Sequence, residues 1–126
     1  MNLLNSDPNP KRGELWTIAK HSEATKGTKK EGFGLVVVVS SVGVGRLRAR
    51  LVARVTPWKD DYRERYWCVE VKSDQHNKLQ GLSCVDTFQL HCVGLDRFKQ
   101  RQGYFSADTM DDIASAVGIV VEVPGP

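Results

Sequence analysis

A run of five aliphatic residues at positions 35–39 (LVVVV) constrains the fold of this chain more than any other stretch. Four of the five are valines, whose stiff χ1 torsion suits an extended backbone better than a helix. The run is too short for a buried helix, and glycine precedes it while Ser-Ser-Val-Gly follows it. Because its apolar side chains point to both faces, both faces must be covered. We therefore predict that residues 35–39 form the central core strand.

In the second informative stretch, residues 46–56, apolar side chains alternate without a break with side chains that are mostly basic. This pattern predicts a half-buried antiparallel strand. Its outer face would carry a row of basic side chains spaced roughly 6.5–7 Å apart, close to the phosphate spacing of a nucleic-acid strand. The row consists of Arg46, Arg48, Arg50 and Arg54. Two interpretations remain open: a nucleic-acid-binding face, or an exposed face that pairs with acids and discourages edge aggregation.

Further alternating segments predict strands at 11–19, 66–72 and 82–93, and a last short strand at 102–105. Asp86 falls on the predicted buried side of its strand, where an unpaired carboxylate would be costly. Trp58, in the turn after residue 56, is predicted to be either a lid on the core or a platform for base stacking. The polar stretch 20–32, which contains Lys29 and Lys30, predicts a loop long enough to have a function.

An amphipathic helix is predicted at residues 107–121. Ser106 is a suitable N-cap, and Phe105 and Met110 can form a hydrophobic staple around it. Apolar residues at helical spacing predict one packed face, made of Met110, Ile113, Ala114, Val117, Val120 and Val121. Several strands followed by one closing helix favour a mainly β fold, a small antiparallel barrel or half-barrel capped by the helix.

The composition is that of one globular domain, residues 1–126, with an irregular arm at 1–10 and a body at 11–123. No apolar run approaches the ~18–20 residues of a membrane span, and the first residues lack the pattern of a secretory signal. The odd number of cysteines (Cys68, Cys84 and Cys92) and the absence of CxxC spacing predict buried free thiols in a reducing cytoplasm. The same pattern argues against a metal site.

The net charge of +3 is unevenly distributed along the chain. Residues 46–65 carry seven Lys/Arg against three acids, whereas residues 106–126 carry four acids and no Lys or Arg. A basic middle and an acidic end indicate that one face meets a polyanionic or acidic partner. The alternative is a solvated surface that happens to be basic.

Three blocks of the sequence are informative together: residues 12–16 (RGELW), residues 34–40 (GLVVVVS) with 52–56 (VARVT), and residues 88–93 with 96–98 and 103–106. Over residues 11–121 they resemble the bacterial MazF/PemK (Kid) toxin family, which shares a fold with the gyrase poison CcdB. Residues 12–16 (RGELW) are similar to the opening RG-[DE]-[IV]-[WY] strand of that family. Residues 34–40 (GLVVVVS) and 52–56 (VARVT) are similar to its RPVVVIS … VVPIT pairing. The third block, before the terminal helix, is similar to (D/E)Q-I-R-T-(I/L)D…RL…G-x-L-S and comprises residues 88–93, 96–98 and 103–106.

This resemblance implies a homodimeric, SH3-like antiparallel β barrel closed by a C-terminal α-helix. It also implies cleavage of single-stranded RNA without a metal or other cofactor, and an acidic antitoxin protein that blocks the groove. Thr56 matches the catalytic threonine of the family. Gyrase poisoning is disfavoured, because CcdB proteins end their helix in Trp-Gly-Ile and this chain ends in VEVPGP.

The chain departs from the family at the catalytic arginine, because Gly34-Leu35 stands in place of Arg-Pro. Metal-free RNA cleavage needs a proton acceptor for the 2′-hydroxyl and a cation for the charge that builds on the phosphate. We expect Arg54, on the same strand face as Thr56, to replace the arginine, with Lys29 and Lys30 as competing substitutes. His91, which replaces the arginine of the third block, is the expected proton carrier.

Three alternatives to this assignment remain. Arg54 could pair with an acid on the next strand, such as Glu70. Without a replacement for the arginine, the protein would be a weakened endoribonuclease. It could also be a non-catalytic member that binds nucleic acid or an antitoxin on the same scaffold.

Overall fold

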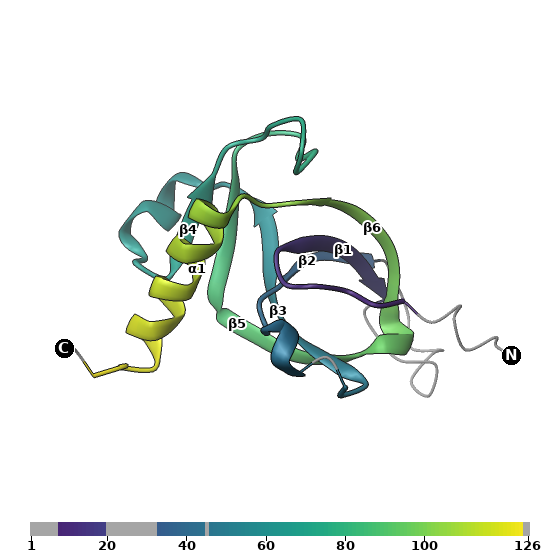
Figure 1. Ribbon diagram of the computed structural model, residues 1–126. Helices are drawn as coiled ribbons and strands as arrows, with labels where there is room; N and C mark the ends of the chain where they lie inside the picture. Colours follow the sequence, from purple (N-terminus) through teal and green to yellow (C-terminus); the bar gives the residue numbers. More distant parts are fainter. Residues whose placement is uncertain (1–7, 20–32, 45, 125–126) are drawn as a thin grey trace, which may run out of the picture.

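The computed structural model describes residues 8–19, 33–44 and 46–124. Within them the chain forms β1 (Glu14–Ala19), β2 (Phe33–Val38), β3 (Ala49–Pro57), β4 (Cys68–Val71), β5 (Ser83–Gly94), β6 (Phe98–Tyr104) and α1 (Ala107–Val120) (Figure 1). Short 3₁₀ turns lie at Val42–Val44, Asp60–Glu64 and Leu95–Arg97. The predicted strands and terminal helix are all present, although most of their boundaries shift by one to four residues.

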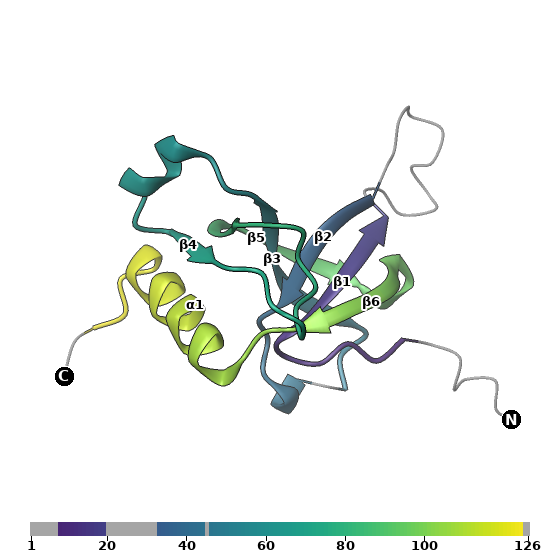
Figure 2. The same ribbon diagram turned by 90° about the horizontal axis from the view of Figure 1, so that it is seen from above.

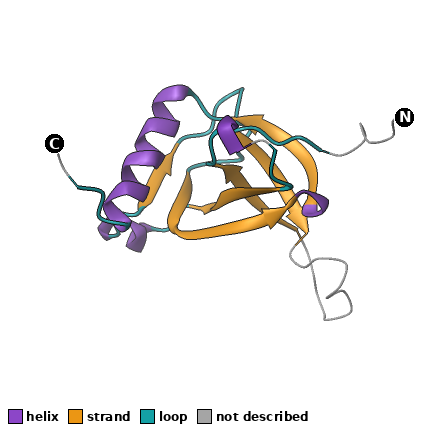
Figure 3. Ribbon diagram, turned by 60° about the horizontal axis from the view of Figure 1, so that its bottom comes forward, coloured by secondary structure: helices purple, strands orange, loops and turns teal. Residues whose placement is uncertain are grey.

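The strands form one antiparallel sheet in the order β4-β5-β3-β2-β1-β6. Figures 1 and 2 show that the sheet is strongly curved, with β6 wrapping around β1 and with α1 beside β4 and β5. The two edge strands, β4 and β6, do not pair with each other in the described residues. The predicted mainly β architecture with a terminal helix is therefore confirmed, but the sheet is open rather than a closed barrel (Figure 3).

The central position of residues 35–39 is also confirmed, because β2 lies between β1 and β3. Val37 is fully buried and packs in one core cluster with residues that include Ile113 of α1. Val36 and Val38 point to the opposite face and are buried in a second cluster with residues that include Val93. The two clusters explain why this strand has no polar side: each face of β2 covers a different half of the core.

A large bulge interrupts β5 where it pairs with β3. Ala53 pairs with Leu90, but Arg54 pairs with Asp86, so residues 87–89 are left over on β5. The Asp86 carboxylate accepts hydrogen bonds from the backbone N of Phe88 (3.0 Å) and from Nε2 of Gln89 (2.8 Å). Asp86 is therefore not an unpaired buried acid, since its carboxylate stabilises the bulge.

The helix begins as predicted but packs differently. Oγ of Ser106 accepts a hydrogen bond from the backbone N of Thr109 (3.2 Å), and Phe105 and Met110 are both buried in one core cluster. The buried side chains are Met110, Ile113 and Ala116, whereas Ala114 and Val121 are exposed and Val117 and Val120 are half-buried. The buried side chains form one row with i, i+3 spacing along the helix. The predicted packed face was therefore wrong for the second half of the helix. No helix of the described chain is long and apolar enough to cross a membrane.

The cysteines differ from one another in exposure. Cys84 is buried and Cys68 is half-buried, and burial raises the pKa of both thiols. Cys92 is exposed, so the prediction of three buried thiols was wrong for this residue. It falls after the β5 bulge, where the alternation inferred from residues 82–93 no longer holds.

Candidate functional site

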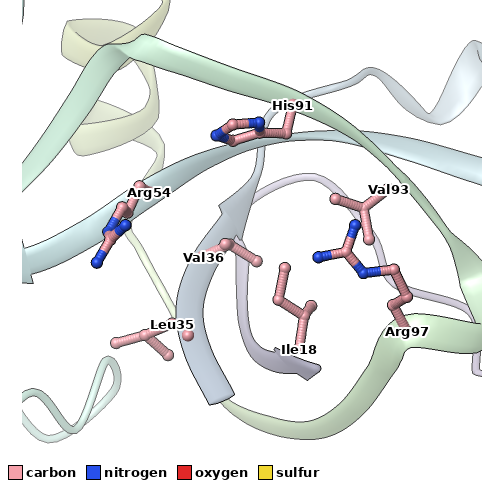
Figure 4. Close-up of a pocket in the computed structure, with 8 residues that line it drawn as sticks. Ile18, Leu35, Val36, Arg54, His91, Val93 and Arg97 are labelled. Atoms are coloured by element: carbon pink, nitrogen blue, oxygen red, sulfur yellow. The ribbon is translucent and has the colours of Figure 1, made fainter. Parts of the chain in front are cut away.

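A pocket of about 370 Å³ combines basic walls with an apolar floor (Figure 4). Arg54 of β3, His91 of β5 and Arg97 of the Leu95–Arg97 turn provide the polar side chains. None of the described lining residues is acidic. The floor is formed by Ile18, Leu35, Val36 and Val93, and Gly34 completes the lining. We call this the cationic pocket.

The sheet register brings these side chains to one face. Arg54 lies opposite Val36 of β2, and His91 lies opposite Val52 of β3. Directly paired residues of an antiparallel sheet point to the same side, so Arg54 and His91 share the face of Val36 and Val52. Arg54 is exposed on this face, so the outward orientation predicted from alternation along the strand is confirmed.

Arg54 is exposed and has no ion pair among the described residues. The alternative in which Glu70 neutralises it is not found, because β5 lies between β3 and β4 and Glu70 pairs with Cys84. The acid opposite Arg54 is Asp86, whose carboxylate is engaged by Phe88 and Gln89 of the bulge. The guanidinium is therefore available on the wall of the cationic pocket.

Arg97 was not among the candidate residues inferred from the sequence. Its Nε donates a hydrogen bond to the carbonyl of Ala19 (2.9 Å), which joins the Leu95–Arg97 turn to the end of β1. Figure 4 shows its guanidinium directed across the pocket above Ile18. Residues 96–98 belong to the third block of the resemblance, and this was the only signal that could have indicated Arg97.

Thr56 lies in a neighbouring pocket of about 500 Å³, which we call the threonine pocket. Leu35 lines both pockets, so they share one wall. Leu35 pairs with Val55, and one further step of this register brings Gly34 opposite Thr56. The structure thus places Thr56 beside the Arg54 and His91 pair rather than within the same pocket.

The far wall of the threonine pocket is a tightly held loop, residues 72–82. The buried amide of Asn77 accepts hydrogen bonds from the backbone N of Asp74 (3.1 Å) and of Leu79 (3.0 Å), and it donates one to the carbonyl of Lys72 (3.1 Å). Hydrogen bonds from the backbone N–H groups of Asn77 and His76 lower the pKa of the Asp74 carboxyl. The loop therefore carries its own network, which fixes its shape.

This loop also docks on β6. Gln102 Nε2 donates hydrogen bonds to the carbonyls of Asn77 (3.0 Å) and Lys78 (3.3 Å). Gly103 passes so close to the carbonyl of His76 that a Cβ atom has no room there. Lys78 adopts a positive φ of 56°, an uncommon conformation for a residue with a side chain, and it lines the threonine pocket.

The predicted row of four arginines does not exist as one surface. Arg50 is only 4 % exposed, and it donates hydrogen bonds to the carbonyl of Pro10 (2.8 Å) and to Oδ1 of Asn9 (3.0 Å). It anchors the segment before β1 and is not exposed for a nucleic acid. The strand begins at Ala49, and Nη1 of Arg50 also donates hydrogen bonds to the carbonyl groups of residues 47 and 49.

Arg46 and Arg48 are exposed but precede β3. They are therefore not part of the strand face that carries Arg54. Trp58 is half-buried and makes an edge-to-face contact with Tyr62, with ring centroids 5.8 Å apart. Lys29 and Lys30 lie outside the described residues. No group of three or more potential metal ligands occurs in the part of the chain that the structure describes.

Comparison with solved structures identifies the class of protein that has this fold. A mycobacterial endoribonuclease in complex with its cognate antitoxin superposes with a TM-score of 0.71 at 20% identity, covering 93% of this chain and 99% of that one. MazF in a MazE–MazF complex from Deinococcus radiodurans gives 0.72 at 16% identity over 94% and 100% of the two chains. Mycobacterium tuberculosis toxin MazF-mt6 gives 0.67 at 20% identity over 90% and 100%. The fold is therefore that of the MazF toxins.

The sequence agrees with this classification. Residues 11–121 match the PemK-like, MazF-like toxin family of type II toxin-antitoxin systems, and the chain belongs to this family. Comparison with curated proteins gives no significant match.

Proposed function

We propose that this protein is a toxin that cleaves single-stranded RNA without a metal ion. The observation that carries the proposal is the cationic pocket, which is lined by Arg54 and His91, has no acid among its described lining residues and shares Leu35 with the pocket of Thr56. Family membership supports it, as does the mycobacterial endoribonuclease that shares the fold. An anionic substrate suits a site of this charge.

The proposed reaction is attack of an RNA 2′-hydroxyl on the adjacent phosphate. The 2′-oxygen forms a bond to phosphorus, the bond to the 5′-oxygen breaks, and a cyclic phosphate and a 5′-hydroxyl result. Neutral His91 takes the proton of the 2′-hydroxyl, and the 5′-oxygen receives a proton from solvent. Arg54 stabilises the charge on the phosphate oxygens, and the Thr56 hydroxyl donates a hydrogen bond to the same group.

The proposal includes the assembly of the toxin. We expect a homodimer in the cytoplasm and an acidic antitoxin that covers the cationic pocket and so excludes RNA. Two structures with this fold contain a bound antitoxin, the mycobacterial complex and the Deinococcus radiodurans complex, and they support this part of the proposal. Lys29, Lys30, Arg46 and Arg48 remain candidates for contacts with RNA outside the pocket.

The decisive experiment incubates the purified protein with a long single-stranded RNA in excess EDTA and maps the new ends. Arg54→Ala should lower the cleavage rate by about 10²-fold or more while the far-ultraviolet circular dichroism stays unchanged. Arg63→Ala is the matched control, since Arg63 is exposed and lines neither pocket. Equal cleavage by parent and Arg54→Ala would show that Arg54 is only a surface residue.

A second candidate function is binding without catalysis. Gly34 provides no cation opposite Thr56, and the Thr56 hydroxyl and the Arg54 guanidinium line different pockets. Tight RNA binding with no new ends in the EDTA experiment would favour this function over the endoribonuclease.

A further inference from the structure

A third pocket, formed by the segment before β1 and the residues that follow β2, also gathers basic side chains. Its volume is about 190 Å³, and it shares no described lining residue with the cationic pocket or the threonine pocket. No acid is present among the described residues that line it. Its polar lining includes three basic side chains and two hydroxyl groups, those of Lys11, Arg12, Arg50, Ser40 and Ser41. We call it the serine pocket.

Arg50 is the buried cation of the serine pocket, since it is only 4 % exposed. Its guanidinium donates four hydrogen bonds, to Oδ1 of Asn9 and to the carbonyl groups of Pro10, Leu47 and Ala49. A guanidinium has five N–H donors, so at least one of them has no acceptor among the described residues. All four acceptors are neutral, and they leave the positive charge without a counterion. A buried charge in this state is costly, because desolvation is not offset by an opposite charge.

The chain segments around the pocket provide no acid that compensates this charge. The only acid in residues 8–19 and 40–50 is Glu14, which does not line the pocket. Its carboxylate accepts hydrogen bonds from Nε1 of Trp16 (3.0 Å) and from Nε of Arg101 (3.0 Å). Glu14 therefore joins β1 to β6, and the positive charge of the serine pocket faces an anion from outside the described chain.

The other polar groups of the pocket suit the oxygens of such an anion. Oγ of Ser40 accepts a hydrogen bond from the backbone N of Leu51 (3.2 Å), so its O–H can donate to a ligand. Lys11 and Arg12 are exposed, and neither has an ion pair among the described residues. Charge-assisted hydrogen bonds from these groups and from Arg50 are the kind that bind phosphate oxygens in proteins.

Volume and charge restrict the ligand further. Sites for drug-sized molecules measure about 300–1,000 Å³, so the serine pocket is too small for a whole nucleotide. It has room for one tetrahedral oxyanion, since a water molecule needs only about 30 Å³. A phosphate monoester carries a charge of about −1.5 to −2 at pH 7, which matches three cations better than the single charge of a carboxylate does.

We propose that the serine pocket binds a dianionic phosphate group, either as inorganic phosphate or as the terminal phosphate of a molecule that stays outside. Arg50 and the serine hydroxyls bind its oxygens, and Lys11 and Arg12 contact it from the solvent side. The phosphate compensates the buried charge of Arg50 and joins the segment before β1 to the residues after β2. This inference does not depend on the proposed function, because none of the residues assigned to the reaction lines the serine pocket.

Inorganic phosphate is the probe for the first test. At about 10 mM it should raise the midpoint of thermal unfolding by about 3–5 °C relative to sodium chloride of equal ionic strength. In NMR spectra of the ¹⁵N-labelled protein, the backbone amide signals of Ser40 and Ser41 should shift and then saturate. Shifts confined to Arg54 and His91 would place the anion in the cationic pocket and overturn the proposal, as would an unchanged midpoint.

Two variants at the rim of the pocket test the cations without removing a buried group. Lys11→Gln and Arg12→Gln should each weaken the affinity for phosphate by about 3- to 10-fold, the effect of one exposed charge-assisted hydrogen bond. The matched controls are Lys59→Gln and Arg63→Gln, since both residues are exposed and line none of the three pockets. The controls should keep the affinity within about 2-fold of the parent, because isolated surface charges contribute little.

Arg50→Gln tests the buried cation itself. In a folded Arg50→Gln variant, which circular dichroism identifies, phosphate should no longer raise the unfolding midpoint. Arg50 also holds Asn9 and Pro10, so a variant that does not fold is replaced by the double variant Lys11→Gln/Arg12→Gln, which should likewise abolish the rise. An unchanged phosphate affinity in the double variant would overturn the proposal.

Two further arms of the experiment distinguish the sources of the phosphate. The affinity for inorganic phosphate is measured in the presence of a 2′-O-methylated oligoribonucleotide that carries a 5′-phosphate, and of the same oligonucleotide without it. Competition by the phosphorylated form alone would identify the terminal phosphate of a larger molecule as a ligand, and competition by neither would identify free phosphate. Equal competition by both would overturn the assignment of a dianionic group, because the internal phosphates of the strand carry one charge each.

Discussion

Replacing Gly34 with arginine tests whether the site lacks a cation opposite Thr56. A Cβ atom built at Gly34 meets no atom within 4 Å, so a side chain can begin there without a clash at its first carbon. The register brings Gly34 opposite Thr56, and Gly34 lines the cationic pocket, so a guanidinium from this position can reach both pockets. Gly34→Arg should therefore raise the rate of RNA cleavage.

The expected gain in cleavage rate can be estimated from the contribution that one preorganised charge makes to catalysis. Removal of one such group typically costs about 10²–10³ in rate. Because the proposed function already assigns part of this stabilisation to Arg54, we expect a gain of about 10- to 100-fold, equivalent to about 1.4–2.7 kcal/mol of activation free energy. The assay measures initial rates on one RNA at saturating concentration, so that improved binding alone does not raise the rate.

Two control variants distinguish the effect of placing a positive charge at position 34 from the effects of side-chain size and of added charge elsewhere. Gly34→Gln adds a neutral side chain of similar reach, and Ser115→Arg adds the same charge on an exposed position of α1. Neither should raise the rate by more than about 2-fold. A Gly34→Arg rate no higher than that of Gly34→Gln would refute the idea that the site is short of a cation opposite Thr56.

Four further predictions concern stability, assembly and the thiols. Val37→Ala should lower the free energy of unfolding in urea by about 2 kcal/mol, because Val37 is fully buried and its loss leaves a cavity; an unchanged midpoint would contradict its core position. Sedimentation equilibrium at micromolar concentration should give twice the chain mass of 14.1 kDa, and a monomer at every concentration would remove the homodimer from the proposal. Iodoacetamide at pH 8 should modify exposed Cys92 first and buried Cys84 last, as read by mass spectrometry. In the unfolded chain the Cys84 thiol ionises near its ordinary pKa of 9.0, whereas in the folded protein burial raises its pKa. The free energy of unfolding should therefore fall as pH rises above 9. Cys84→Ala should flatten this decline by up to about 1.4 kcal/mol per pH unit.

Most of the fold could be predicted from the sequence, because the residues within each segment favour the secondary structure that the segment adopts. The valine-rich run marks β2, and the Phe105, Ser106 and Met110 pattern marks the start of α1. The bulge at residues 87–89 could not be predicted, since it depends on Asp86 accepting hydrogen bonds within a paired strand. The bulge shifts the alternation of the residues that follow it, so the exposure of Cys92 could not be predicted either.

The site was predicted less completely than the fold. Alternation correctly gave Arg54 an outward orientation, but the same argument failed for Arg50, whose guanidinium binds carbonyl groups of the segment before β1. Strand periodicity predicts the face of the sheet from which a side chain projects, but it does not predict the groups that the side chain contacts. Arg97 was missed because it lies in a turn, where no period exists and only the packing of the turn on β1 fixes its direction.

The shared wall between the two pockets has a consequence for the geometry of cleavage. The cations Arg54 and Arg97 line one pocket, the Thr56 hydroxyl lines the other, and Leu35 separates them. Groups on both sides can act on one phosphate only if that phosphate lies above Leu35, because a hydrogen bond spans about 3 Å. Leu35 stands at the position where the resemblance to MazF toxins would place proline, directly after the missing arginine. Under the proposed function, the positive charge that faces this phosphate comes from Arg54 of β3 instead of from β2, and we propose that Leu35 supports the reacting linkage from below.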